Sequence, residues 1–239
     1  IFGKDVYGII GHDIFKAFVV EINYQKKYLK LHKPKTYRTK SKSESIPIHI
    51  ENGKPYVSAS ILEADNSKTD IHLLLDTGAT AALSLFDEKV GNPPKTIDTY
   101  LGKGLGGDIY GKLGRIKGFA LGNFEFANLV ATYPDTNSVK FDLKGRQWEG
   151  NIGAEIFKRF LVVFDYQNSR MLLRKNSDYN KIFSYNIIGL QILGTGKNYK
   201  EILVNHVRPD SPADMQGLFI YDKILKIGTR LNIQTIKRK

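Results

Sequence analysis

The stretch Gly150-Asn-Ile-Gly-Ala-Glu-Ile-Phe-Lys-Arg-Phe-Leu-Val-Val-Phe-Asp-Tyr-Gln-Asn-Ser-Arg-Met-Leu-Leu-Arg-Lys-Asn176 decides how this chain is organised, because it is the second copy of an internal repeat. The first copy, residues 8–34, aligns with it without a gap 142 positions earlier, and 12 of the 27 positions are identical. Similarity at this density indicates a duplicated structural unit. Each copy predicts a glycine-flanked turn, a short helix, and two strands joined by a polar turn at residues 24–27 or 166–169.

The second copy closes a longer unit that begins near Ile46 and includes residues 46–176. Ser84 is a candidate N-cap of a short helix within this unit. We therefore expect a mainly β fold with short helices. The first copy has no such unit before it, so we expect the chain to begin within a fold. Short apolar and alternating runs predict strands at residues 46–50, 56–62, 71–76, 96–101, 109–118 and 124–132.

Composition excludes several classes of protein. The chain has 239 residues, of which 41% are hydrophobic and 25% charged, as in an ordinary globular protein. Its longest apolar runs are far shorter than the roughly 20 residues of a membrane-spanning helix. It contains no cysteine, which excludes disulfides and thiolate metal sites but leaves the cellular compartment open.

The net charge of +12 is concentrated at the two ends of the chain. Residues 1–45 carry a net charge of +6, residues 46–184 only +1, and residues 185–239 carry +5. Much of the first excess lies in residues 33–45, which are rich in Lys, Ser and Thr and are typical of a solvated linker. A phosphate-binding arm is the alternative, but no aromatic residues alternate with the basic ones, so nucleic-acid binding is disfavoured.

The sharpest chemical signal is Leu73-Leu-Leu-Asp-Thr-Gly-Ala-Thr80, in which an apolar strand leads into an acidic residue. Alone, the Asp-Thr-Gly sequence is typical of a tight turn in which the aspartate caps an amide and the glycine adopts positive φ. A glycine-rich stretch at residues 101–111 comes next and predicts a hairpin tip. Its G-x-G-x-x-G match is a weak dinucleotide signal, because no helix comes after it.

These motifs, in this order, resemble the retropepsin-like aspartic proteases, and residues 46–176 cover one whole lobe of that fold. The resemblance implies that Asp76 is the catalytic carboxylate, braced by the hydroxyl of Thr77, and that Gly78 allows the sharp return of the chain. It implies a crossing of residues 151–153 under this loop, with residues 9–11 as their equivalents. It also implies that Ala79, which packs against the opposite lobe, contributes to substrate binding. The same is implied for the residues of the flap, Gly104, Leu105, Gly106 and Gly107.

An aspartic protease needs two such lobes. Two carboxylates about 3 Å apart share one proton and activate a water molecule, without a metal or cofactor. This chain has one Asp-Thr-Gly sequence. Residues 1–34 resemble the closing part of a first lobe, whose aspartate we expect upstream of Ile1. The alternative is a homodimer of the lobe at residues 46–176. His12 replaces the small residue found at Ala154 and is given no chemical role.

The chain thus divides into the first copy at residues 1–34, a basic linker at residues 35–45, the complete lobe at residues 46–176 and a tail at residues 177–239. The tail is expected to be a separate module. Strand, turn, helix and strand succeed one another, and Ser211 is a candidate N-cap with Pro212 at the first helical position. This segment resembles part of a PDZ domain. The resemblance implies that the loop containing Ile188, Gly189 and Leu190 binds the C-terminal carboxylate of a peptide. The alternative is a module that only packs against the protease.

Together these observations predict an aspartic-type endopeptidase with a PDZ module, acting on a peptide or protein substrate. The alternative is a non-catalytic peptide-binding protein built on the same lobe. No nucleic-acid partner, membrane span or metal site is expected. Chains with this combined pattern resemble bacterial proteins of the cell envelope, which implies export to the periplasm or beyond.

Overall fold

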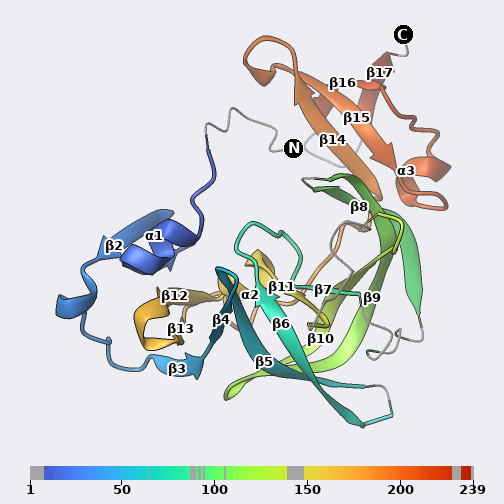
Figure 1. The fold of residues 1–239 in the computed structure, drawn as a ribbon. Helices are drawn as coiled ribbons and strands as arrows, with labels where there is room; N and C mark the ends of the chain where they lie inside the picture. The colour runs from blue at the N-terminus through green and yellow to red at the C-terminus, as the bar shows by residue number, and fades with distance from the viewer. Residues whose placement is uncertain are drawn as a thin grey trace.

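The computed structural model describes residues 8–63, 65–86, 90, 93, 95–104, 106–138, 148–227 and 233–237. These residues form three β-sheets accompanied by a few short helices (Figure 1). The mainly β fold class is thereby confirmed. None of the helices in this part of the chain has the length and apolar character needed to cross a membrane.

The first sheet joins the two copies of the repeat, in the strand order β2-β1-β12-β13-β3. A short helix precedes the strands of each copy, α1 (His12–Ala17) in the first and α2 (Ala154–Phe157) in the second. The helix and two strands predicted for each copy are therefore confirmed. The strands of this sheet are β1 (Val19–Asn23), β2 (Tyr28–His32), β3 (Glu44–Pro47), β12 (Phe160–Asp165) and β13 (Arg170–Lys175).

The two copies pair with each other about a local two-fold axis. Strands β1 and β12 run antiparallel, and residues that are equivalent in the repeat occupy mirrored positions along the ladder. Half a turn about an axis through the central pair therefore exchanges the copies. The pairs are Val20 with Phe164, Glu21 with Val163, and Ile22 with Val162.

Glu21, at the centre of this pairing, is only 1% exposed. Its carboxylate accepts hydrogen bonds from the Tyr28 hydroxyl at 2.7 Å and the Lys40 ammonium at 2.8 Å, and His32 Nε2 lies 3.4 Å away. Burial raises the pKa of Glu21, but the bonds from Lys40 and Tyr28 outweigh it, so the pKa is lowered. Lys40 belongs to the basic linker, which is therefore not wholly solvated: Tyr37, beside the short 3-10 helix Pro34–Thr36, also packs on this sheet.

Because folding lowers the pKa of Glu21, its ionised form stabilises the folded state above the unfolded pKa of about 4.3, and this contribution is lost as the pH falls through the folded pKa. We expect Glu21→Gln to cost about 1–3 kcal/mol at pH 7 and progressively less as the pH falls below the unfolded pKa and through the lowered folded pKa. Urea unfolding over this pH range measures the effect, with Glu51→Gln at an exposed position as the control. Parallel pH profiles for Glu21→Gln and the parent protein would contradict this account.

The second sheet has the strand order β4-β5-β6-β11-β7-β10-β9-β8 and closes on itself where β5 also pairs with β9. Ser60, for example, lies opposite Ala120 across this closure. Six strands thus form a small barrel, from which β4 and β8 extend. The strands are β4 (His49–Glu51), β5 (Lys54–Leu62), β6 (Lys68–Leu75), β7 (Leu83–Leu85), β8 (Thr96–Gly104), β9 (Gly107–Leu121), β10 (Phe124–Pro134) and β11 (Gly150–Ile152).

One hydrophobic core fills the barrel and continues under the first sheet. In β6 every second residue, Ile71, Leu73 and Leu75, is buried, as expected for a strand with one face on the core. All six residues of β12 are buried, because this strand has β1 and β13 at its edges and packing on both faces. Phe160, Val162 and Phe164 belong to the barrel core. The barrel and the second copy of the repeat therefore share one hydrophobic core.

The prediction that a helix begins at Ser84 is wrong. Ser84 is the middle residue of β7, and its hydroxyl is hydrogen-bonded to the Thr132 hydroxyl at 2.8 Å. Leu83 and Leu85, on either side, are fully buried, so the alternation of a strand outweighs the local capping signal. The strand predicted at residues 46–50 is also two strands, β3 and β4, which belong to different sheets.

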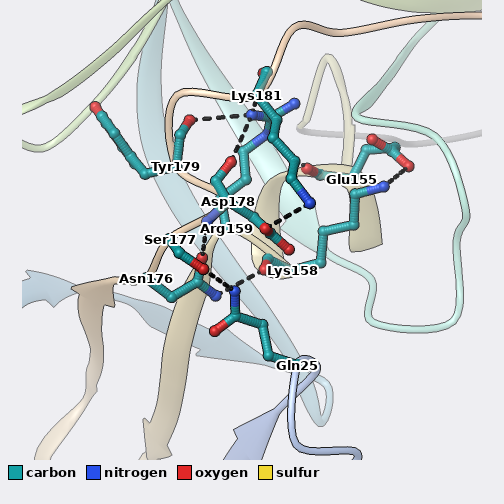
Figure 2. A network of polar contacts seen from close by, with 9 residues as sticks. All are labelled: Gln25, Glu155, Lys158, Arg159, Asn176, Ser177, Asp178, Tyr179 and Lys181. Atoms are coloured by element: carbon teal, nitrogen blue, oxygen red, sulfur yellow. Dashed lines mark hydrogen bonds and ion pairs between the residues drawn. The ribbon is translucent and has the colours of Figure 1, made fainter.

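A buried arginine fastens the segment after β13 (Figure 2). Arg159, only 1% exposed, donates hydrogen bonds to the carbonyls of Asp178 at 3.1 Å, Tyr179 at 3.0 Å, and Lys181. Its guanidinium also lies 3.7 Å from the centre of the Phe183 ring. Its equivalent in the first copy is Ala17, so this anchor belongs to the second copy alone.

The third sheet, β14-β15-β16-β17, forms the tail module with α3 (Pro212–Met215). The N-cap predicted at Ser211 is confirmed, because its hydroxyl accepts a hydrogen bond from the Asp214 amide at 3.3 Å. Gly217 comes after the helix with a φ of +70°. The strands are β14 (Leu190–Thr195), β15 (Glu201–Val207), β16 (Lys223–Ile227) and β17 (Ile233–Lys237), and a 3-10 turn spans Lys197–Tyr199.

Candidate functional site

A loop that carries Asp76 leaves the end of β6 and returns as β7, yet these two strands are not neighbours in the sheet. Strand β11 lies between them, parallel to β6 and antiparallel to β7. Ile152 is therefore opposite Leu75 on one side and Leu83 on the other. The Asp76 amide donates to the Ile152 carbonyl at 2.9 Å. Hydrogen bonding to β11 thus fixes the point at which the Asp76 loop leaves β6.

Gly153 lies directly against this loop. A Cβ atom at Gly153 would come within 2.4 Å of the Ala81 carbonyl oxygen and 2.8 Å of the Ala79 carbonyl oxygen. The Gly153 amide donates to Ala82 at 3.0 Å, and the Ala154 amide donates to Ala79 at 2.8 Å. The close crossing expected for residues 151–153 is thus present in the geometry, and it requires glycine.

The carboxylate of Asp76 is held by backbone amides. Its Oδ1 atom accepts hydrogen bonds from Gly78 at 2.9 Å and from Ala79 at 3.1 Å, and the residue is half-buried. The aspartate therefore caps backbone amides, as expected for a tight turn at Asp-Thr-Gly. Gly78, however, does not adopt the positive φ that such a turn predicts. A Cβ at Gly78 would instead lie 3.3 Å from Oδ1 and crowd the carboxylate. Within the described part of the chain, the Thr77 hydroxyl makes no hydrogen bond, so the expected brace is not formed there.

A cavity of about 270 Å³ lies beside Asp76. One wall comes from the end of β6, including Asp76 and Thr77, and another from the turn between β4 and β5. The facing wall comes from the first copy of the repeat and includes Gly11, His12 and Phe15 of the α1 region. Asp76 therefore borders a cavity between the barrel and the first copy.

The negative charge of Asp76 also acts on Tyr24, in the polar turn of the first copy. Burial, together with the negative charge of Asp76, raises the pKa of Tyr24 to about 12. Sequence reasoning did not assign Tyr24, His12 or Phe15 to the site. The repeat makes His12 and Phe15 equivalent to residues of α2, and Tyr24 equivalent to Tyr166. Only the pairing of β1 with β12 brings the first copy to the cavity beside Asp76.

Among the described residues, no loop covers the first copy as the Asp76 loop covers the second. Ile152 is completely buried under the Asp76 loop, whereas its equivalent Ile10 is 59% exposed. Gly153 is crowded by the loop, whereas no atom in the described part of the chain lies within 4 Å of the position that a Cβ at its equivalent, Gly11, would take. Gly11 also borders the cavity beside Asp76. Residues 9–11 therefore form an exposed surface next to the cavity that Asp76 borders, and we call this surface the Gly11 seat.

The glycine-rich stretch forms the predicted hairpin. Gly104 pairs with Gly107 at its end, and Gly106 lies between them in the turn; Leu105, also assigned to this tip, lies outside the described residues. Gly107 has a φ of +124°, which favours glycine. None of the described hairpin residues lines the cavity beside Asp76. The structure thus forms the hairpin without bringing it into contact with that cavity.

The expected peptide-binding loop of the tail is tightly held. Gly189 has a φ of +76°, and a Cβ there would lie 2.3 Å from Cβ of Ser211. Its amide donates to the Asn186 side-chain oxygen at 3.1 Å, and its carbonyl accepts from the Arg208 amide at 2.8 Å. The Ile188 carbonyl accepts from Ala213 at 3.0 Å, and Leu190 pairs with Val207. The Gly189 amide is therefore engaged within the module.

The fold and the site define a mainly β protein in which a closed barrel presents one amide-bound carboxylate at a loop crossed by a strand. Neither a scan against protein-family models nor a search of the curated proteins found a match for this chain. The function is therefore inferred from the site itself.

Proposed function

We propose that this chain belongs to an aspartic-type endopeptidase and that Asp76 is one of its two catalytic carboxylates. The observation that carries the proposal is the Asp76 loop: β11 separates its two strands, two amides hold its carboxylate, and a cavity opens beside it. The tail module would bind peptide or partner segments.

The second carboxylate would come from a loop bound on the Gly11 seat. In the second copy, Gly153 packs under the Asp76 loop; the two-fold pairing of β1 with β12 makes Gly11 the equivalent position. Gly11 and Asp76 border the same cavity, so an equivalent loop on this seat would bring its own acidic residue close to Asp76. A further lobe of the same chain or a second subunit could supply this loop.

The chemistry depends on two carboxylates that cannot both be ionised at short distance. They share one proton and hold a water molecule between them. One carboxylate removes a proton from the water as it attacks the peptide carbonyl, and the other donates a proton to the carbonyl oxygen. The amides of Gly78 and Ala79 orient Asp76 for this role, and the β8–β9 hairpin would close over the peptide.

The test is peptide cleavage by the complete two-lobed protein. We expect Asp76→Asn to lower kcat by at least about a thousand-fold without unfolding the barrel, because removal of one acid–base partner abolishes water activation. Asp70→Asn is the matched control, since Asp70 is an exposed aspartate on β6, the strand that leads into the Asp76 loop. A pepstatin-like inhibitor should block cleavage by the parent protein. Unchanged cleavage by Asp76→Asn would remove the proposal, and peptide binding without cleavage would favour the non-catalytic alternative.

A further inference from the structure

The tail module contacts the β8–β9 hairpin, and the two lie side by side in Figure 1. The Gln191 side chain, on β14, donates a hydrogen bond to the Tyr100 carbonyl at 3.0 Å. The His206 ring, on β15, lies 5.2 Å from the Tyr100 ring and 6.3 Å from the Tyr110 ring. Two strands of the tail thus meet one place on the hairpin.

The contacted residues of the hairpin lie next to an irregularity in its strand pairing. Tyr100 and Tyr110 are a cross-strand pair with ring centres 5.2 Å apart. The pairing register shifts immediately afterwards, between Tyr100 and Gly102, and Gly102 has a φ of +134°. Such an irregularity bends a strand and redirects the residues beyond it. The tail therefore contacts the hairpin where the bend sets the direction of its glycine-rich end.

The tyrosine at the centre of this contact is buried. Tyr100 is 7% exposed, and its hydroxyl donates to the Asp108 carboxylate at 3.1 Å. The Nε2 atom of His206 is buried and has no hydrogen-bond partner among the described residues. Burial and the nearby positive charge of Arg208 lower the pKa of His206, so the ring packs against the tyrosines in its neutral form.

We infer that the tail module is a positioning device for the β8–β9 hairpin, with His206 as the positioning residue. The contact holds the bend at Tyr100, and the bend directs the glycine-rich end beyond it. The consequence for substrate binding rests on the proposed function, in which this hairpin closes over the peptide; the contact itself does not. A ligand bound to the tail would act on the hairpin through the same three side chains: Gln191, His206 and Tyr100.

Hydrogen exchange of the full chain, measured by mass spectrometry, tests the contact without any assay of activity. In His206→Ala we expect peptides covering residues 98–104 and 106–111 to exchange about three- to tenfold faster, because an aromatic contact that restrains local opening is lost. His206→Phe retains an aromatic ring and should keep exchange within about twofold of the parent. Met215→Ala, at an exposed site of the tail, is the control for general effects on the module.

Unchanged exchange of the hairpin in His206→Ala overturns the inference, whether the tail stays folded or unfolds, because an unfolded tail would also release the hairpin. Tyr110→Ala removes the contact from the hairpin side, and it should speed hydrogen exchange of peptides from β15 by a similar factor. In the complete two-lobed protein, His206→Ala should raise KM for peptides about three- to tenfold with kcat changed less than twofold. If no cleavage is found at all, the proposed function fails, while the exchange result still decides the contact.

Discussion

Gly153→Ala is expected to destabilise the barrel by about 2–4 kcal/mol. Alanine is compatible with the backbone here, since φ is −122° and ψ is −167°. The cost arises from the surroundings, because the new methyl group would lie 2.4 Å from the Ala81 carbonyl oxygen. The Asp76 loop or β11 would have to shift, and overpacking of this kind is costly. Urea unfolding monitored by the fluorescence of Trp148, the single tryptophan, measures the loss.

The repeat offers a matched control. Gly11 has nearly the same conformation, with φ at −115° and ψ at −160°, but no atom of the described residues lies within 4 Å of its Cβ position. Gly11→Ala should therefore change the stability of this chain by less than about 1 kcal/mol, in either direction. Equal losses for the two variants would contradict the assigned role of Gly153. Under the proposed function, in which a second loop occupies the Gly11 seat, Gly11→Ala in the two-lobed protein should become as damaging as Gly153→Ala.

Arg159→Met is expected to cost about 3–5 kcal/mol in the free energy of unfolding. Methionine fills a similar volume but donates no hydrogen bond, so the carbonyls of Asp178, Tyr179 and Lys181 lose a charged donor in a buried site. The contact with the Phe183 ring also loses its cation. Urea unfolding measures the total loss, and limited proteolysis should show earlier cleavage within residues 177–183.

Lys158→Met is the control for Arg159→Met. Lys158 is the adjacent cation and pairs with Glu155, but its side chain is 42% exposed. An ion pair of this kind contributes little, so the variant should stay within about 0.5 kcal/mol of the parent. Similar losses for the two variants would mean that charge in this region, rather than the buried hydrogen bonds of Arg159, stabilises the segment.

Local patterns were sufficient for elements whose residues decide their own conformation. Matching apolar positions in the two copies predicted both helices and the strands after them, and the Ser211 N-cap needed only its own helix. Ser84 shows where this fails. A serine before an apolar run fits a helix start, but β7 forms because β10 and β11 supply hydrogen-bond partners from distant parts of the chain.

The sequence by itself determined the mainly β fold, the duplication, the strand leading into Asp76 and the glycine-rich hairpin, because each depends on periodicity or on residues close in the chain. Only the tertiary structure decided what surrounds Asp76. The wall from Gly11 to Phe15 reaches the carboxylate through the pairing of β1 with β12, which joins residues about 140 positions apart. The contact of His206 with Tyr100 likewise depends on how two modules pack. Such contacts leave no local pattern, since the assembled sheets decide which side chains meet.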